Sequence, residues 1–309
     1  MRAAFVRTLM ALAAQDPRIM LLAGDLGYMA LEPFRDQFPG RFINVGVAEQ
    51  NMVGVATGLA DAGFIPFVYS IAPFAALRPY EFIRNGPIQH QLPVRIVGMG
   101  GGFEYGTNGL SHYGLEDLGV MRIQPGITVI APADHQQAET ALRASWHLPG
   151  PIYYRLGKDD KTVVPGLDGR FSLDTLECVG EGPHLLMITT GSIASEAAAA
   201  AQALAAQGVP GTLLVAATLR PAPCEELAGW LARFAAVMTV EAHYREGGLG
   251  SLVAEVIAER GLRCRLVRCG VGAVLDGLSG SQSYLHQKYG LAREALVARA
   301  LQTVRAQPA

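Results

Sequence analysis

Short apolar runs alternate with longer segments of helical periodicity along the first half of the chain. The runs expected to form strands are Ile19–Ala23, Phe42–Val45, Ile65–Tyr69, Val94–Gly98, Thr128–Ala131 and Ile152–Tyr154. Helical patterns lie around residues 49–62, 74–86, 115–122 and 135–147. Strands that alternate with helices in this way predict a mostly parallel sheet covered by helices on both faces.

The alternation is interrupted between residues 157 and 183, where charged residues, prolines and glycines replace the apolar runs. It resumes behind this segment, with strands expected at His184–Thr189, Gly211–Val215, Ala236–Glu241 and Cys264–Arg268. Helical patterns lie near residues 194–207, 224–234, 248–259 and 291–306. We therefore predict two α/β domains, each a mostly parallel sheet flanked by helices, over residues 1–160 and 183–309, with a linker at 161–182.

The N-terminal segment superficially resembles a signal peptide, because two arginines precede an apolar stretch at Leu9–Ala14. That stretch is short, however, and Phe5, Leu9, Leu12 and Ala13 share one face at helical spacing. A surface helix leading into the first strand is the better interpretation. No run of about 18 apolar residues occurs, so we expect no membrane partner and a cytoplasmic protein.

The composition is that of a compact globular protein. Half of the 309 residues are apolar, only 17% are charged, and the formal net charge is -2, which excludes a largely disordered chain. The 25 lysines and arginines are scattered, so we expect no nucleic-acid partner. The four cysteines form no C-x-x-C pair, and buried free thiols are expected rather than a zinc site or a disulfide framework.

Common nucleotide-binding and nucleophile motifs are absent or incomplete. The glycine-rich segment Gly98–Phe103 follows an expected strand, but Phe103 stands where a dinucleotide-binding fingerprint needs a third small residue. The sequence contains neither a G-x-x-x-x-G-K-[ST] loop nor a G-x-S-x-G elbow. These absences argue against the corresponding nucleotide and serine-hydrolase chemistries.

The segment from Asn44 to Ala60 carries the most chemical information. An expected strand ends there, Gly46 makes a turn, and Glu49 falls in the first turn of a helix. Gly54 and Gly58 lie four residues apart on one face of that helix, which leaves the backbone open to close approach by another helix or subunit. An acid in a first helical turn ordinarily only compensates the helix dipole, so Glu49 taken alone does not indicate catalysis.

The pattern Gly-x-Ala-Glu-Gln at Gly46–Gln50 resembles the thiamine-diphosphate enzymes of the transketolase family, and the similarity continues in register. Phe67–Ser70 and then Phe74 follow where the family has a strand and the aromatic residue that stacks on the cofactor's pyrimidine. Tyr105–Tyr113 is similar to the family's D-G-P-T-H segment. Val240–Gly250 resembles the V-E-E-x-x-x-x-G-G-x-G of the family's C-terminal domain. The resemblance covers essentially the whole chain.

The resemblance implies one subunit of a heteromeric, split transketolase, which transfers a two-carbon ketol unit from a ketose or ketose phosphate to an aldose. Full-length family members hold the diphosphate and its divalent metal on an N-terminal domain with a G-D-G…N motif, and Gly24–Leu26 does not supply that motif. The implied partner is therefore a separate subunit bearing G-D-G…N, in an α2β2 heterotetramer. The implied cofactors are thiamine diphosphate and Mg²⁺ (or Ca²⁺ or Mn²⁺), with the metal held mainly by the partner and no metal ligands on this chain.

The same resemblance implies roles for individual residues. Glu49 would hydrogen-bond pyrimidine N1′ and exchange a proton with it, which prepares the cofactor to lose its thiazolium C2 proton. Phe74 would carry the pyrimidine on its ring face, with a core aromatic as the alternative, and Asp25 matches a family acid near the cofactor. His112 would hydrogen-bond the oxygen of the two-carbon unit, with a structural histidine as the alternative.

Substrate recognition is implied at two further positions. Arg155 coincides with a family arginine that binds a sugar phosphate, the alternative being a solvated arginine at a strand end. Asn108 replaces the acidic residue of D-G-P-T-H that contacts a sugar hydroxyl, and Met99–Gly101 occupies the region of a family histidine. Both departures suggest a specialised sugar or a secondary-metabolite pathway. The role of His243, structural or functional, is left open.

Two other functions are compatible with the resemblance. The β subunit of a 2-oxo-acid dehydrogenase E1 component also places a glutamate at this point and passes an acyl group to a lipoyl domain. A non-catalytic assembly subunit of the same fold is the second alternative. Ser111-His112 and the Glu116-Asp117 helix favour a transketolase over the dehydrogenase, and the presence of Glu49, Phe74 and His112 together favours a catalytic subunit.

Overall fold

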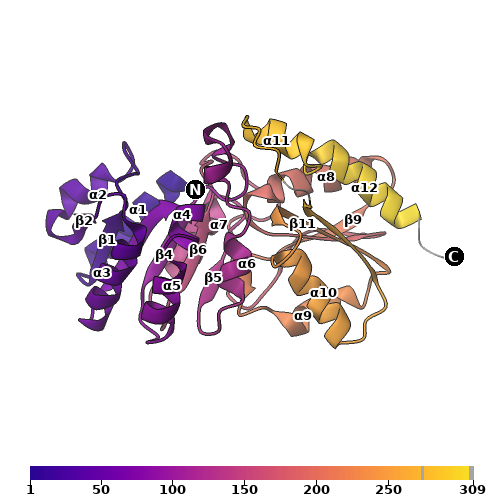
Figure 1. Ribbon diagram of the computed structural model, residues 1–309. Coiled ribbons are helices and arrows are strands. Elements are labelled where there is room, and N and C mark those ends of the chain that lie inside the picture. The colour runs from indigo at the N-terminus through magenta and orange to yellow at the C-terminus, as the bar shows by residue number, and fades with distance from the viewer. Residues whose placement is uncertain (273–274, 306–309) are drawn as a thin grey trace.

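The computed structural model describes residues 1–272 and 275–305. Two α/β units lie side by side, the first in indigo to magenta and the second in orange and yellow (Figure 1). Each contains a mostly parallel sheet flanked by helices, as the sequence predicts. No helix within the described ranges is both long and apolar enough to cross a membrane.

The first sheet has seven strands and is parallel except at one edge. The strands are β1 (Ile19–Ala23), β2 (Phe42–Asn44), β3 (Ile65–Ile71), β4 (Arg95–Met99), β5 (Thr128–Ile130), β6 (Ile152–Leu156) and β10 (Thr218–Arg220). Their order is β10-β5-β6-β4-β3-β1-β2. All neighbours pair in parallel except β10, which runs antiparallel to β5.

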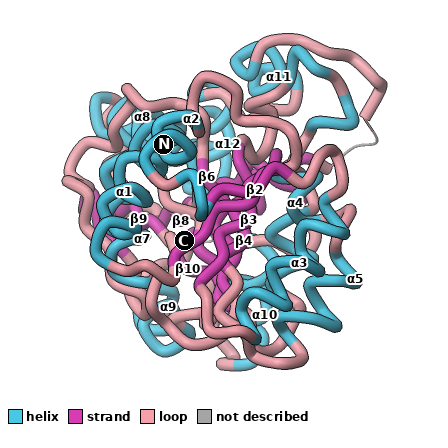
Figure 2. Tube along the Cα trace, turned by 90° about the vertical axis from the view of Figure 1, so that its left-hand side faces the viewer, coloured by secondary structure: helices cyan, strands magenta, loops and turns pink. Residues whose placement is uncertain are grey.

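Helices cover both faces of this sheet, which explains why its strands are apolar at successive positions. The side chains of Ile19 and Leu21 pack toward one helical layer, and those of Met20 and Leu22 pack toward the other. One layer contains α1 (Arg2–Gln15) and α7 (His135–Ser145). The other contains α3 (Glu49–Asp61), α4 (Ala72–Ala76), α5 (Tyr80–Ile83) and α6 (Asp117–Arg122). Figure 2 shows α1 and α7 on one side of the strands and α3, α4 and α5 on the other.

The second sheet has five strands in the order β12-β11-β8-β9-β7, with β7 antiparallel to β9. The strands are β7 (Glu177–Pro183), β8 (Leu186–Thr189), β9 (Gly211–Val215), β11 (Ala236–Tyr244) and β12 (Arg265–Val271). Helices α8 (Ala194–Ala206) and α12 (Arg293–Arg305) pack on one face, and α9 (Cys224–Leu231) and α10 (Leu249–Glu259) on the other. The remaining α-helices are α2 (Glu32–Gln37) and α11 (Gln282–Lys288).

The structure departs from the sequence-based expectations at a few elements. The single helix expected over 74–86 is divided into α4, α5 and a π-turn at Arg84–Ile88, because Pro79 begins a new helix and Pro87 lies inside the turn. Residues 177–182, expected in the linker, belong to β7. That strand contains two glycines and a proline, so its sequence is typical of a loop, and its place at the sheet edge tolerates them.

The two units share apolar packing and backbone pairing. One buried cluster contains Met121 of α6 together with Val253 of α10, and β10 follows β9 in the chain yet pairs with the first sheet. Of the four cysteines, all free, only Cys269 is fully buried, whereas the sequence suggested burial for all. The expected inner face of the N-terminal helix, from Phe5 to Ala13, is buried.

Candidate active site

The carboxyl group of Glu49 lies at the centre of the candidate site. Gly46 turns the chain after β2 with a φ of 73°, a conformation that favours glycine. Glu49 is then the first residue of α3 and is only 1% exposed. The helix start therefore holds a carboxyl group inside the protein, near the carboxyl ends of the parallel strands, where α/β proteins bind ligands.

Two side chains contact this carboxyl group. The hydroxyl of Ser70, near the end of β3, donates a hydrogen bond to Oε1 at 3.0 Å. Nη1 of Arg78, just beyond α4, donates to Oε2 at 3.0 Å. Gly24 lies on a third side of the carboxyl group. A Cβ atom at this position would be only 3.4 Å from Oε1, so the glycine leaves room there.

Aromatic rings extend the site away from Glu49. The guanidinium carbon of Arg78 lies 3.8 Å from the centre of the Phe74 ring, in cation–π geometry. The imidazole of His112 meets Phe74 edge-on, with 5.0 Å between the ring centroids. Arg78 thus connects the two residues expected to bind the cofactor ring, and His112 lies directly beside them.

The loop that carries His112 also places Asn108. It contains two short 3-10 turns, Gly106–Asn108 and Leu110–His112, and Asn108 is exposed. Ser111 Oγ lies 3.0 Å from Nδ1 of His112. Tyr105 begins the loop, with its ring centroid 6.4 Å from that of His112, and the Lys158 ammonium lies 4.1 Å from the Tyr105 ring centre.

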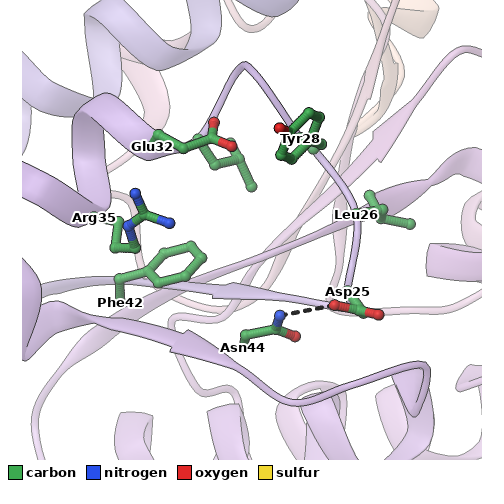
Figure 3. A pocket seen from close by; sticks show the side chains of 9 residues that line it. Asp25, Leu26, Tyr28, Glu32, Arg35, Phe42 and Asn44 are labelled. Carbon is green, nitrogen blue, oxygen red and sulfur yellow. Dashed lines mark hydrogen bonds between the residues drawn. The ribbon is translucent and has the colours of Figure 1, made fainter.

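Asp25 follows Gly24, at the edge of the same region. It adopts a positive φ of 55° and accepts a hydrogen bond from Asn44 Nδ2 at 2.9 Å. The pair lines a cavity of about 200 Å³. Figure 3 shows Tyr28, Glu32 and Arg35 across the cavity from this pair. Asp25 is exposed, so its carboxylate is available to a ligand in that cavity.

Arg155, for which the sequence predicted sugar-phosphate binding, is buried against protein groups. It is 5% exposed, and its Nε lies 3.0 Å from Oδ2 of the fully buried Asp117. Its Nη2 donates to the backbone carbonyls of Gly114 at 2.5 Å and Ala242 at 2.8 Å. Protein groups on both sides of the domain boundary bind this guanidinium. These contacts favour a structural role for Arg155, and its binding of a sugar phosphate stays a prediction.

His243 also lies at this interdomain contact. Its Nε2 accepts a hydrogen bond from the backbone N–H of Gly119 at 3.1 Å, so its proton is on Nδ1, 2.7 Å from the carbonyl of Tyr244. Burial lowers the pKa of this imidazole. Neutral, buried and bonded at both nitrogens, His243 has a structural role.

Sequence reasoning missed Ser70 and Arg78 as site residues. Ser70 had a detectable signal, since it is a polar residue in an otherwise apolar strand. Arg78 follows Phe74 by four residues, a spacing that puts two side chains on one face of a helix, but nothing in the sequence alone connects either residue to Glu49.

The cluster fits an aromatic, nitrogen-containing ring better than a metal ion. Within residues 1–272 and 275–305, no group of three or more His, Cys, Asp or Glu side chains is arranged to hold a metal. The buried carboxyl group of Glu49 and the face of Phe74 instead receive a planar group that donates an N–H bond, as the contacts of Arg78 demonstrate. An aminopyrimidine protonated at N1′ has the same two properties, so the residues present fit the pyrimidine of thiamine diphosphate.

The fold and this cluster define a two-domain α/β protein with a carboxyl–aromatic ligand site at the carboxyl ends of its first sheet. Residues 1–162 match the family model described as "Transketolase, pyrimidine binding domain", and residues 174–296 match "Transketolase, C-terminal domain". The chain belongs to the transketolase family.

Several relatives are similar along nearly their whole length. A 6-deoxy-6-sulfo-D-fructose transketolase subunit of Clostridium sp. (strain MSTE9) is 35% identical, over 96% of this chain and 92% of that one. An apulose-4-phosphate transketolase subunit of Phocaeicola vulgatus is 31% identical, over 98% and 97% of the two chains. The solved structure of a split-gene transketolase, an inactive β4 tetramer, superposes with a TM-score of 0.88 at 34% identity, covering 99% of this chain and 98% of that one.

Proposed function

We propose that the chain is the pyrimidine-binding subunit of a split, thiamine-diphosphate-dependent transketolase that transfers a two-carbon ketol unit to an aldose. The observation that carries this proposal is that one planar N–H donor, the Arg78 guanidinium, contacts both the buried carboxyl group of Glu49 and the ring face of Phe74. The two relatives named as transketolase subunits support it, because each matches this chain almost end to end.

Four side chains have roles in this proposal. The carboxyl group of Glu49 holds and moves the proton at N1′ of the pyrimidine, while Ser70 fixes its other oxygen. Phe74 supports the ring and excludes water from its face. His112, beside Phe74, donates a hydrogen bond to the substrate oxygen that gains negative charge. The cofactor, when bound, supplies the carbanion chemistry that no protein side chain provides.

The diphosphate and its Mg²⁺ are assigned to a partner subunit that carries the G-D-G…N motif. Support comes from the relatives, because two are named as single subunits of a transketolase and the superposed structure is that of a split-gene enzyme. By this proposal the site lies between chains of an α2β2 assembly.

The substrate is proposed to be a small sugar or sugar phosphate other than the ordinary pentose phosphates. Asn108 presents an amide rather than a carboxylate on the loop beside His112, and an amide both donates and accepts hydrogen bonds. The two relatives are named for 6-deoxy-6-sulfo-D-fructose and apulose 4-phosphate, which are both unusual sugars. A panel of ketose donors and aldose acceptors tests this point, and full activity with xylulose 5-phosphate and ribose 5-phosphate would count against it.

The decisive test of the function is Glu49→Gln in the complex with the partner subunit. Calorimetry with thiamine diphosphate and Mg²⁺ should show binding by the wild-type mixture, and turnover should fall about 10²- to 10⁴-fold in the variant, as expected for loss of acid–base catalysis. Glu139→Gln is the matched control, because Glu139 pairs with an arginine at 2.9 Å on α7. Unchanged turnover with Glu49→Gln, or no cofactor binding by any mixture, would refute the proposed function.

A further inference from the structure

We propose that Arg78 is a placeholder for the cofactor's pyrimidine ring. The inference rests on the proposed function and concerns the chain before the cofactor arrives. Arg78 makes both contacts expected of the ring: its Nη1 donates to Oε2 of Glu49 at 3.0 Å, and its guanidinium carbon lies 3.8 Å from the centre of the Phe74 ring. One side chain thereby fills both halves of the site.

The chemical likeness between the two groups explains how this is possible. A guanidinium is planar and delocalised, donates N–H bonds in its plane and stacks on aromatic faces. An aminopyrimidine protonated at N1′ shares these properties. Oε1 of Glu49 is held by Ser70, so Oε2 is the oxygen at which the ring and Arg78 compete. Both cannot occupy the face of Phe74 and this oxygen together.

The placeholder protects the carboxyl group while the site lacks its ligand. Glu49 is 1% exposed, and a buried carboxylate without a partner is unfavourable. The side chain of Arg78, in contrast, is 41% exposed. Water can therefore hydrate its guanidinium when that group moves away from Glu49. Among the described residues, the only side-chain hydrogen bond that Arg78 makes is the one to Glu49. Its departure therefore disturbs no other contact of that kind.

Competition between Arg78 and the ring lowers the apparent affinity for the cofactor. The measured dissociation constant equals the intrinsic one divided by the fraction of molecules in which Arg78 has left the site. A partly exposed ion pair and a cation–π contact together hold Arg78 in the site firmly enough to reduce the apparent cofactor affinity about tenfold. Removal of the guanidinium should restore this tenfold of cofactor affinity. Added salt should also tighten cofactor binding relative to a site without such a pair.

The experiment is calorimetry of thiamine diphosphate with Mg²⁺ on the complex of this chain with its partner subunit. Arg78→Ala should bind the cofactor about tenfold more tightly than wild type, and Arg78→Lys should fall between, because an ammonium keeps the charge without the planar face. Arg84→Ala is the matched control, since Arg84 is exposed and its side chain hydrogen-bonds only its neighbour Asn85 within the described part of the chain. Thermal melts of all variants check that they are folded.

A second measurement needs neither cofactor nor partner. Phenylglyoxal labelling followed by mass spectrometry reports how free each arginine is, and Glu49→Gln in the chain alone should raise the labelling rate of Arg78 several-fold while that of Arg84 stays constant. An Arg78→Ala complex that binds no more tightly than wild type, or an unchanged labelling rate, would overturn the placeholder and leave the function standing. If no variant binds the cofactor, the function fails and the placeholder fails with it.

Discussion

Replacing Arg155 with methionine should destabilise the whole chain rather than weaken substrate binding. Arg155 forms an ion pair with Asp117 at 3.0 Å and donates to a carbonyl on each side of the domain boundary, at 2.5 and 2.8 Å. The two charged side chains are 5% and 0% exposed. Removing one partner of such a buried pair costs about 3–5 kcal/mol, because the other charge is left unpaired in the interior.

Urea unfolding at pH 7 measures this cost in the chain alone. The midpoint for Arg155→Met should fall by about 1 M or more relative to wild type. Adding Asp117→Asn to the variant should recover part of the loss, because no charge then remains buried without a partner. Arg143→Met is the control: Arg143 pairs with Glu139 on the exposed face of α7, and such pairs contribute about 0.3–0.5 kcal/mol.

Sugar-phosphate binding by Arg155 would give a different result. If Arg155 instead bound a sugar phosphate, Arg155→Met would change the unfolding free energy by about 0.5 kcal/mol or less, as surface substitutions do, and would raise KM for phosphorylated donors. That combination would refute the structural role of Arg155. Failure of Asp117→Asn to recover any stability would show that the unpaired carboxylate is not the cause of the loss.

Two further predictions concern histidines, His112 at the candidate site and the buried His286. His112→Gln should lower kcat about 10²-fold, as expected for the loss of one hydrogen bond to developing charge, with the cofactor dissociation constant unchanged; a loss of cofactor binding instead would contradict the assignment. His286 is 3% exposed, and burial lowers its pKa from 6.5 to about 4. Below pH 6.5 this imidazole therefore binds a proton in the unfolded chain but not in the folded chain. The free energy of unfolding falls by about 1.4 kcal/mol per pH unit down to pH 4. Urea unfolding at pH 7.5, 6 and 5 should show a stability loss on acidification that is larger in wild type than in His286→Leu by this amount, and equal slopes would contradict it.

The fold was largely predictable because its central strands are buried on both faces and therefore apolar at most positions. The expected bounds Ile19–Ala23 and Gly211–Val215 coincide with β1 and β9. The strands that were missed are those whose stability comes from a neighbour. Strand β10 has three residues and β7 carries glycines and a proline, so neither shows a pattern of its own. Their pairing partners, distant in sequence, decide their structure.

The site was predictable to the extent that it depends on local sequence. Gly46 and the helix that starts at Glu49 follow from turn and helix signals, and the structure brings Glu49 and Phe74 to the same guanidinium. Arg155 shows what local sequence cannot provide. Its position near the end of β6 gives no indication that a second domain covers it, and only the contact with Ala242 reveals the difference.

Arg155 and Arg78 illustrate how burial decides what the same chemical group does. Both guanidinium groups face a buried carboxylate at 3.0 Å, but Arg155 is covered on all sides and is 5% exposed, whereas the Arg78 side chain is 41% exposed. Movement of Arg155 would leave the charge of Asp117 unpaired, with only the hydroxyl of Tyr153 still bonded to it. Movement of Arg78 leaves Glu49 unpaired only until a planar ligand donates to the same oxygen. The chain therefore combines a fixed ion pair, whose arginine also bonds a carbonyl of the second domain, with an exchangeable pair at the site, and only the exchangeable pair can respond to a cofactor.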